Sequence, residues 1–493
     1  MTFSFNATLK PLVLAMMLTS MGAFADHHGK KPEAAPAADT AAATATPAPA
    51  APAAEAAKPV EIVPEPLAVF LPDLLKTDRR IKSSQSDFDK ELLTAKGKMG
   101  EWYPNIKLTA WAGKEHINNA GTTANTDMDP IEYDLAFTQL LWDFGKTSAA
   151  VRQADLKADK KQTTLGGTRQ QVMLEAATAY VNLYRALEVQ NYASRSEQNL
   201  YRQLQMEESK LTAGAGKASD VQQARSTLAG ASARRARAQQ AVQQASNRFL
   251  NVFGRYPSSI AGMRKAALPD NLLPANMEEA IKVAMESSTT LSNARKDLNI
   301  EREAVREERA NSFLPKLELL HDYKHKDDVA GTAGLKVENT TKVQLTWDVD
   351  LGFSGRHNVA AAEFGVAKAS ADLTDSERNV TEQVRNAWQT LEMTKRTKGY
   401  LDQQVEAAEK FLELARKEQQ AGKRSLLDVL TGETAYMNAL SDAASADSDI
   451  LLSAFGLLQS MGTLSEDAVT RLPVVKAAET GPEAIKTAAA TTP

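Results

Sequence analysis

The sequence predicts a mainly helical protein that carries a small β component and is built from an internal duplication. Three observations lead to this fold class. Landmark motifs recur 208 to 211 residues apart, short segments alternate apolar with polar residues, and long stretches without proline are rich in Gln, Ala, Arg, Glu and Lys. Alternation with a period of two indicates strands that are apolar on one face. The proline-free composition is typical of long helices.

Composition excludes several classes of protein. The 493 residues contain no cysteine, so we expect no disulfide scaffold, no thiolate metal site, no cysteine nucleophile and no acylated N-terminal cysteine. The formal net charge of -4 argues against nucleic acid as a partner. After residue 25 no run of 18 apolar residues occurs, so no transmembrane helix is expected.

Both ends of the chain differ from the rest. Residues 1–25 combine a basic Lys10, an apolar core and the small residues Ala23 and Ala25, which together predict a cleavable signal peptide for export. Residues 26–64 are dominated by alanine and proline and are expected to be disordered. A second disordered segment is expected at 466–493.

The internal repeat organises everything between these ends. Each copy is expected to contain a helix, a strand, a loop, a strand and a very long helical hairpin. The first repeat spans 65–254 and the second 277–465, and residues 255–276 link them. Strands are predicted at about 103–113, 131–143, 314–324 and 342–353, loops at about 114–130 and 324–341, and hairpins at 146–254 and 356–462. The paired landmarks are Pro104 with Pro315, Gly145 with Gly355, Asp220 with Asp428 and Gly254 with Gly462.

The predicted strands point to a membrane. Four strands with one apolar face cannot close a barrel, whereas three copies supply twelve strands. Apolar-out and polar-in alternation over about 9–11 residues is the weak signature of an outer-membrane barrel. A small sheet packed on the helices is the alternative. The residues predicted to face lipid are Tyr133, Leu135, Phe137, Val343, Leu345, Trp347 and Val349.

Each long helix is predicted to turn back at a glycine. About 65 residues at 1.5 Å per residue make a rod on the order of 100 Å. The rods end at Gly214 and Gly422, and Ser219 and Ser425 are the expected caps of the returning helices.

Taken together, these features resemble the TolC family of outer-membrane export channels. The resemblance rests on the export signal, the duplicated unit, Gly-x5-Asp-Val after each turn and Tyr-Pro or Leu-Pro before a strand, and it covers about residues 65–465. It implies a trimer with one 12-stranded outer-membrane β-barrel, four strands per chain, continued by a 12-helix periplasmic α-barrel. The implied partners are a periplasmic adaptor (membrane fusion protein), an inner-membrane ABC or proton-driven transporter, and outer-membrane lipid.

The resemblance also implies where the pore narrows. Asp428 matches an acidic position at the periplasmic entrance, so three copies would form a ring of carboxylates that favours cations. Thr431 occupies a second position that is often acidic in the family, so the ring is expected to be weaker. A carboxylate in the first turn of a helix, favoured by the helix dipole, is the alternative for Asp428.

A gate and an adaptor contact follow from the same matches. Ser219 and Asp220 match acceptors of the gate, Arg424 matches its basic partner, and Gln419 replaces a gating tyrosine. An Arg424–Asp220 latch between neighbouring hairpins is therefore expected. The residues implied to meet the adaptor lie in the two turns: Gly214, Gly216, Gly422 and Lys423.

No catalytic site is predicted. The histidines lack the HExxH spacing, His321 and His325 are assigned to a strand end and a loop, and no GxSxG or phosphate-binding loop occurs, so no enzyme activity, metal or cofactor is expected. Residues 421–462 resemble the branch that serves ATP-driven protein exporters, which favours type I secretion. A drug or metal efflux channel is the alternative, and a periplasmic coiled-coil adaptor or structural protein is the alternative of another class.

Overall fold

The computed structural model describes residues 66–118, 125–257, 263–266 and 268–470, all of which belong to one packed unit. The expected signal peptide, the Ala/Pro-rich segment up to residue 64 and most of the expected C-terminal tail lie outside the described residues. Nothing in the structure therefore tests them.

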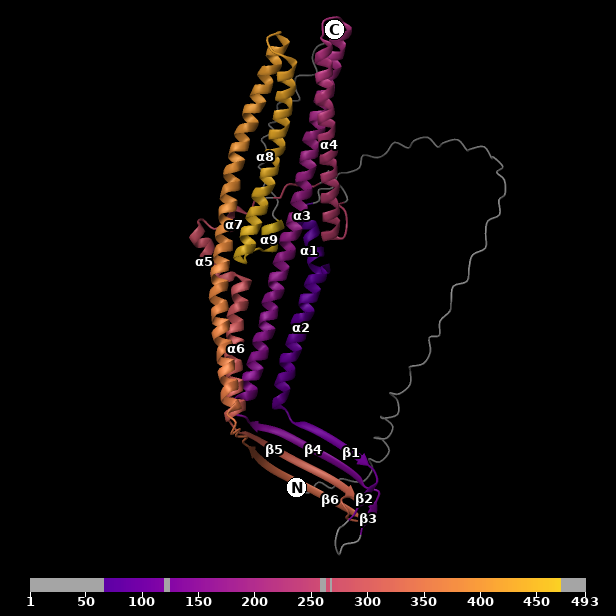
Figure 1. Cartoon of the computed structure of the whole chain (residues 1–493), viewed down its shortest axis with the longest axis vertical. Helices are drawn as coiled ribbons and strands as arrows, with labels where there is room; N and C mark the ends of the chain where they lie inside the picture. Colours follow the sequence, from indigo (N-terminus) through magenta and orange to yellow (C-terminus); the bar gives the residue numbers. More distant parts are fainter. Residues whose placement is uncertain (1–65, 119–124, 258–262, 267, 471–493) are drawn as a thin grey trace, which may run out of the picture. The chain divides into compact units, whose positions relative to one another are not determined.

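The long helices and the four longer strands follow the same order in both repeats (Figure 1). The first repeat contains α1 (Leu67–Thr77), α2 (Arg79–Met99), η1 (Gly100–Trp102), β1 (Asn105–Ala112), β2 (Glu115–Ile117), β3 (Thr126–Met128), β4 (Ile131–Trp142), α3 (Lys146–Thr212) and α4 (Ala218–Phe253). After η3 (Asp270–Leu272), the second contains α5 (Met277–Ser287), α6 (Thr289–Phe313), β5 (Lys316–Asp327), β6 (Leu335–Thr346), α7 (Ser354–Gln420), α8 (Leu426–Met461) and α9 (Glu466–Thr470).

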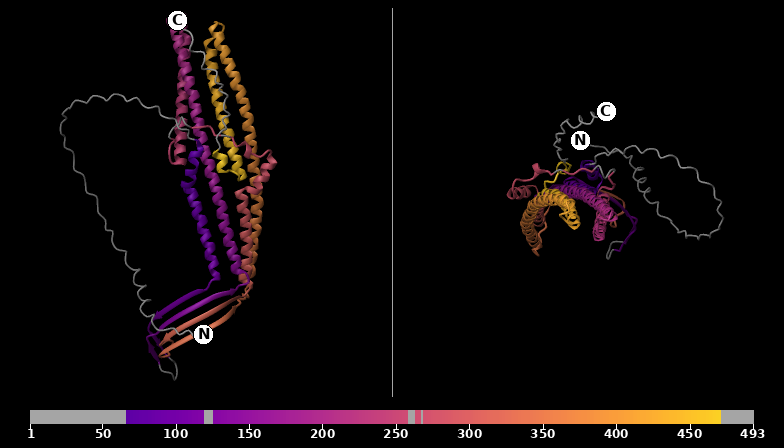
Figure 2. Two further views of the ribbon diagram at one scale, coloured as in Figure 1. Left: turned by 180° about the vertical axis from the view of Figure 1, so that it is seen from behind. Right: turned by 90° about the horizontal axis from the view of Figure 1, so that it is seen from above.

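The helices form a single curved row. Toward the hairpin turns the neighbours run α4, α3, α8, α7, and toward the sheet they run α2, α3, α6, α7. Viewed along their axes, the helices trace an arc (Figure 2). The helices α3 and α7 have 67 residues each, so each extends on the order of 100 Å.

An aspartate initiates each of these long helices. The Asp143 carboxylate accepts hydrogen bonds from the backbone N–H of Gly145 and Thr147, at 3.1 and 2.6 Å. Asp350 accepts from the corresponding groups of Gly352 and Ser354, at 2.8 and 3.1 Å. The N–H groups of Thr147 and Ser354 lie in the first turns of α3 and α7 and lack partners inside the helix, so each carboxylate satisfies one of them.

Four antiparallel strands form one sheet in the order β1-β4-β5-β6, and β2 pairs with β3 in a separate ribbon. The prediction of a strand at 342–353 is wrong, because β6 spans Leu335–Thr346. Its last residue pairs with Lys316 at the start of β5. Pro315 precedes that start and has no backbone N–H, so the ladder ends there although the alternation continues to Leu351.

The loop expected at 324–341 is correspondingly shorter, since both strands continue into its polar sequence. Lys324 pairs with Glu338 and Lys326 with Lys336 in the ladder. Glu338 forms ion pairs with Lys326 and Lys336, at 3.1 and 2.7 Å. Charged cross-strand neighbours therefore stabilise a segment that looks like a loop by composition.

The largest hydrophobic core surrounds the middle of α3. Tyr180 is fully buried there, and its hydroxyl donates to the Arg264 carbonyl at 2.8 Å while accepting from the Arg264 N–H at 3.0 Å. Phe70 of α1 packs edge-on against Phe249 of α4 at 5.3 Å between ring centroids. This core joins α1, α3, α4, α5, α8 and the linker between the repeats.

The core also includes residues expected in the tail. The prediction of disorder from residue 466 is wrong for its first residues, because α9 spans Glu466–Thr470. Ala468 and Val469 are buried, as is Leu464 just before them. Burial of these side chains orders five residues that have no helical signal of their own.

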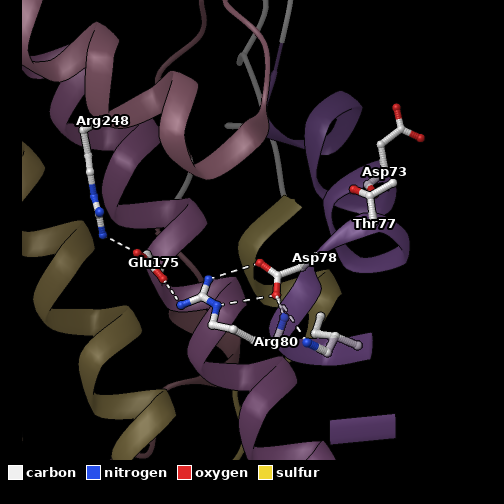
Figure 3. Close-up of polar contacts among 7 residues, drawn as sticks. Asp73, Thr77, Asp78, Arg80, Glu175 and Arg248 are labelled. Carbon is white, nitrogen blue, oxygen red and sulfur yellow. Dashed lines mark hydrogen bonds and ion pairs between the residues drawn. The ribbon is translucent and has the colours of Figure 1, made fainter. Parts of the chain in front are cut away.

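A charged network lies beside the core, where α1 meets α2 (Figure 3). Asp78 caps α2 by accepting from the backbone N–H of Arg80 and Ile81, at 2.8 and 3.2 Å. The Arg80 guanidinium bridges Asp78 and Glu175 of α3, and Glu175 also accepts from Arg248 of α4. Burial alone would raise the pKa of Asp78, but the hydrogen bonds from Arg80 and Ile81 hold it below its usual value.

Because the pKa of Asp78 is lowered in the folded chain, its contribution to stability is present at neutral pH. That contribution is lost as the pH falls through the folded-state pKa. The network thus connects α2, α3 and α4 at the start of α2.

The glycines that end α4 and α8 allow a matched test of this packing. Gly254 and Gly462 both have positive φ, +71° and +78°, so alanine at either strains the backbone by about 1 kcal/mol or more. At Gly462 an added Cβ would also lie 2.5 Å from the Ser287 carbonyl oxygen, whereas at Gly254 it meets nothing within 4 Å. Gly462→Ala should therefore lower the melting temperature more than Gly254→Ala, measured by circular dichroism in detergent. Equal shifts would contradict the close approach of α8 to the α5–α6 junction.

Candidate functional site

The candidate site comprises the two hairpin turns and the sheet, because these parts hold the residues predicted to gate and to enclose a pore. The turn after α3 and the turn after α7 have the same geometry. Gly214 donates to the Leu211 carbonyl at 3.0 Å, and Gly422 donates to the Gln419 carbonyl at 2.9 Å. Their φ angles are +75° and +72°, a conformation that favours glycine.

The two turns differ at the second residue after Gly214 and Gly422. An added Cβ at Gly216 would lie 2.7 Å from the Leu211 backbone nitrogen, so only glycine fits without movement. The second turn has Arg424 at the corresponding place. Lys423 and Gly422 are exposed, as is Gly214. Two similar backbones therefore present different side chains at the tips.

The returning helices begin differently as well. The Ser425 hydroxyl caps α8 by accepting from the Asp428 N–H at 3.3 Å, and it donates to the Asp428 carboxylate at 2.9 Å. The prediction that Ser219 caps α4 is wrong. The helix α4 begins at Ala218, so Ser219 lies inside it, and the preceding Lys217 makes no side-chain cap.

The two aspartates occupy equivalent positions in the first turns of these helices. Asp220 is partly exposed and accepts from the Ser219 hydroxyl at 3.3 Å. Asp428 is also partly exposed, and Thr431, one turn further, is exposed. Both carboxylates lie where the helix dipole favours negative charge, so a structural role accompanies any role in a pore.

Arg424 does not contact Asp220 within the chain. Its Nε donates to the Glu418 carboxylate at 2.6 Å, and its guanidinium lies over the Phe411 ring at 5.2 Å from the centroid. Both partners belong to α7, the helix that precedes the turn. The residues predicted to form the latch are therefore brought to the same end of the helical row but are not joined in one copy.

A buried carboxylate near the turns was missed by the sequence reasoning. Glu433 of α8 is only 3 % exposed and accepts from Asn199 of α3 and Arg416 of α7. One side chain thus connects three helices close to the tips. Its position seven residues after the buried Leu426, on a stripe with Val429 and Leu430, is the signal that indicates burial of an acid.

Gln419 lies in a cleft of about 780 Å³ between the ends of α3 and α7. Three cationic side chains, Arg202, Lys210 and Arg416, line the same cleft. Lys210 and Arg416 have carboxylate partners, Glu207 and Glu433. The cleft is thus polar and surrounded by charges that are largely compensated.

The sheet has one apolar face. The register places Tyr133, Leu135 and Phe137 of β4 on the same face as Val343 and Leu345 of β6, and most of these side chains are exposed. Trp347 and Val349 are also exposed but follow the end of β6, so they are not strand residues. The Trp347 Nε1 instead donates to the Phe313 carbonyl at 3.2 Å, which holds it against the end of α6.

Two histidines share this apolar face. His321 and His325 lie within β5 rather than at a strand end and in a loop, because β5 continues to Asp327. The His321 Nδ1 lies 2.7 Å from the Thr341 hydroxyl, and the His325 ring lies 6.0 Å from the Tyr133 ring.

The opposite face of the sheet is charged. Lys324 of β5 forms an ion pair with Asp134 of β4 at 3.3 Å, and the Lys326–Glu338 pair connects β5 to β6. The Trp111 Nε1 of β1 donates to the Glu132 carboxylate at 3.0 Å. Each strand is therefore linked to its neighbour by polar side chains on this face.

Within residues 66–470, excluding the gaps noted above, no group of three or more His, Cys, Asp or Glu side chains is arranged to hold a metal ion. Over the same described parts of the chain, the helices include none that is long and apolar enough to cross a membrane.

Known proteins share this arrangement. The sequence profile of the family described as "Outer membrane efflux protein" matches twice, at residues 71–255 and 280–463. Outer membrane protein TolC of Escherichia coli (strain K12) is 25% identical over 381 residues, covering 74% of this chain and 75% of TolC. Outer membrane efflux protein BepC of Brucella suis biovar 1 is 22% identical over 364 residues, covering 72% of this chain and 77% of BepC.

The fold is similar to solved structures as well. The outer membrane protein VceC of Vibrio cholerae superposes with a TM-score of 0.69 at 17% identity, covering 80% of this chain and 96% of VceC. The match in long helices and antiparallel strands agrees with the profile. The chain therefore belongs to the outer membrane efflux protein family, the TolC-like channels that are located in the outer membrane, extend into the periplasm and are not enzymes.

Proposed function

We propose that three copies of the chain close into one channel and that this channel is the outer-membrane exit of a type I secretion system. The observation that carries the trimer is the open sheet. Among the described strands, β1 and β6 each have one edge without a strand partner. Unpaired backbone groups are costly in a bilayer, where no water replaces the missing partner.

Closure by three copies removes both edges. Four strands per chain make twelve in a ring, and β6 of one copy then pairs with β1 of the next. The row of helices also ends in two open sides, α4 and α7, which would meet in the same ring. The apolar face with Tyr133, Leu135 and Val343 then contacts lipid, and the charged face lines the passage.

As an outer-membrane efflux channel of tripartite export systems, the protein needs partners that supply energy. The Ser-Leu-Leu-Asp-Val-Leu sequence after Gly422 and the sequence up to Gly462 favour an ABC transporter with a periplasmic adaptor. The second candidate is the outer-membrane channel of a proton-driven drug or metal pump, which is supported by the similarity to BepC, an outer membrane efflux protein.

The exposed turns are the proposed adaptor contact. Gly214, Gly216, Gly422 and Lys423 lie at the free end of the hairpins, where no other described element covers them. Asp428 and Thr431 lie just behind the second turn, so in a ring they would surround the entrance. Rings of carboxylates in a narrow pore select cations.

In the proposed gate, two carboxylates compete for the Arg424 guanidinium. In one chain its guanidinium is bound by Glu418. In the closed trimer we assign it to Asp220 of a neighbouring hairpin, with Ser219 and Gln419 as further polar groups at this contact. Exposed ion pairs contribute about 0–1 kcal/mol each, which suits a latch that a partner opens.

The trimer is tested by disulfides, since the chain has no cysteine of its own. Thr109 of β1 and Thr340, Lys342 and Gln344 of β6 lie on the charged face. Thr109→Cys combined with Thr340→Cys, Lys342→Cys or Gln344→Cys should give a covalent trimer on oxidation for the pair in register. Thr109→Cys with Thr341→Cys is the control, because Thr341 points to the opposite face. Closure by three copies would be contradicted if every cysteine pair gave only monomers after oxidation and the native mass of the protein in detergent were that of a single chain.

The latch is tested by single-channel conductance in planar bilayers. Arg424→Ser and Asp220→Ala should each raise the open probability, by a factor of up to about five per kcal/mol lost. Glu418→Gln should not raise it, because it releases Arg424 to bind Asp220. If Glu418→Gln opens the channel and Asp220→Ala does not, Arg424 acts within its own hairpin and the latch is wrong.

The choice between cargoes is tested in the native host. A deletion strain should lose specific proteins from the culture medium, measured by mass spectrometry, and a plasmid copy should restore them. Its resistance to a panel of drugs and metals should be unchanged. Unchanged secretion with increased sensitivity would instead favour the efflux pump.

A further inference from the structure

A pocket between the two hairpins is lined by residues that have no role in the proposed channel function. It has a volume of about 310 Å³ and is lined by residues of α3, α4 and α8. Val189 and Ala193 of α3 and Met437 of α8 supply apolar walls. Ser196 of α3 and Arg234 of α4 supply polar groups. Apolar walls with a few convergent polar groups are typical of small-molecule sites.

The polar groups of this pocket lack partners. The Arg234 Nη2 and the Ser196 Oγ are buried and have no hydrogen-bond partner among the described residues. Ser196 is only 3 % exposed. Buried polar side-chain atoms normally have at least one partner, so two such atoms lining one pocket require an explanation.

Other arginines of α4 show what Arg234 is missing. Arg225 pairs with Glu208 at 2.7 Å, and Arg235 pairs with Glu197 at 3.1 Å. Arg248 pairs with Glu175. Arg237, which lines the same pocket, forms no ion pair with a carboxylate of the described residues and is exposed. Arg234 as a whole is half-buried, but its Nη2 is buried, and a guanidinium nitrogen can only donate, so this atom needs an acceptor.

We propose that this pocket binds a small organic anion, a carboxylate or sulfonate with an apolar body. The anionic group accepts from the Arg234 Nη2 and from the Ser196 hydroxyl, and Arg237 adds positive charge at the pocket. The apolar body lies against Val189, Ala193 and Met437. Charge-assisted hydrogen bonds of this kind are the strong ones, and the pocket is larger than an inorganic anion requires.

The site spans both repeats. Ser196 and Arg234 belong to the first hairpin, whereas Met437 belongs to the second. A bound anion therefore adds a connection between α4 and α8, whose direct contact is otherwise small. This role is independent of cargo, of the pump and of the proposed gate.

The test uses the purified full-length protein in its native oligomeric state in a neutral maltoside detergent. The probe is 4-(trifluoromethyl)benzenesulfonate, observed by fluorine NMR, with 4-(trifluoromethyl)benzamide as the neutral analogue. The sulfonate should bind saturably at one site per chain and the amide should not. Arg234→Gln should weaken binding at least about tenfold, the loss expected for one charge-assisted hydrogen bond. Arg225→Gln, on the same helix but outside the pocket, should leave it unchanged.

Thermal unfolding gives an independent readout. Without the probe, Arg234→Gln should melt no lower than the wild type, because it removes a guanidinium whose Nη2 is buried without a partner. With the probe, only the wild type should gain stability. The proposal is overturned if the sulfonate does not bind, if the amide binds equally well, or if Arg234→Gln binds it as tightly. It is also overturned if inorganic sulfate binds as tightly as the probe, or if Arg234→Gln is destabilised without ligand, since Arg234 would then already have an acceptor, such as a neighbouring copy's carboxylate.

Discussion

The packing around Tyr180 is the interaction on which the rest of the structure depends. Elsewhere α3 and α7 touch only the helices beside them, so the row is one helix deep. At Tyr180 the linker between the repeats, the first helix and the ends of α4 and α8 all converge on one core. The double hydrogen bond of the Tyr180 hydroxyl with Arg264 fixes the linker to α3. The Asp78–Arg80–Glu175 network adds a charged clamp on the same side.

The two repeats keep the lengths of their hairpin helices, although their sequences differ at most positions. The helices α3 and α7 have 67 residues each, and α4 and α8 have 36 each. The tips of both hairpins are therefore built on the same backbone. The differences lie in side chains: Gly216 corresponds to Arg424 and Lys217 to Ser425. The second hairpin thus gains the cation and the cap, while the first keeps a turn in which only glycine fits.

Local signals predicted the hairpins, since glycine turns, missing prolines and long polar periodicity act within a few residues of each feature. Features set by a distant partner could not be predicted in this way. The end of β6 depends on Pro315, which immediately precedes β5, and α9 is ordered by a core that is remote in sequence. The same reason explains the candidate site. The turns and Asp428 were found from their motifs, whereas the contact of Arg424 with Glu418 and the burial of Glu433 depend on side-chain packing between helices.

The charged face of the sheet has a consequence for what passes along it. Lys324 pairs with Asp134 across β4 and β5, and Glu338 pairs with Lys326 across β5 and β6 and with Lys336 along β6. A wall of this kind exerts a weak net field on a solute a few ångströms away, because each of these charges has an opposite charge beside it. A channel lined by this face would tolerate cargo of either charge. It would also tolerate cargo whose charge changes sign along its length, such as an unfolded polypeptide. Discrimination by charge would then be confined to the far end of the helices.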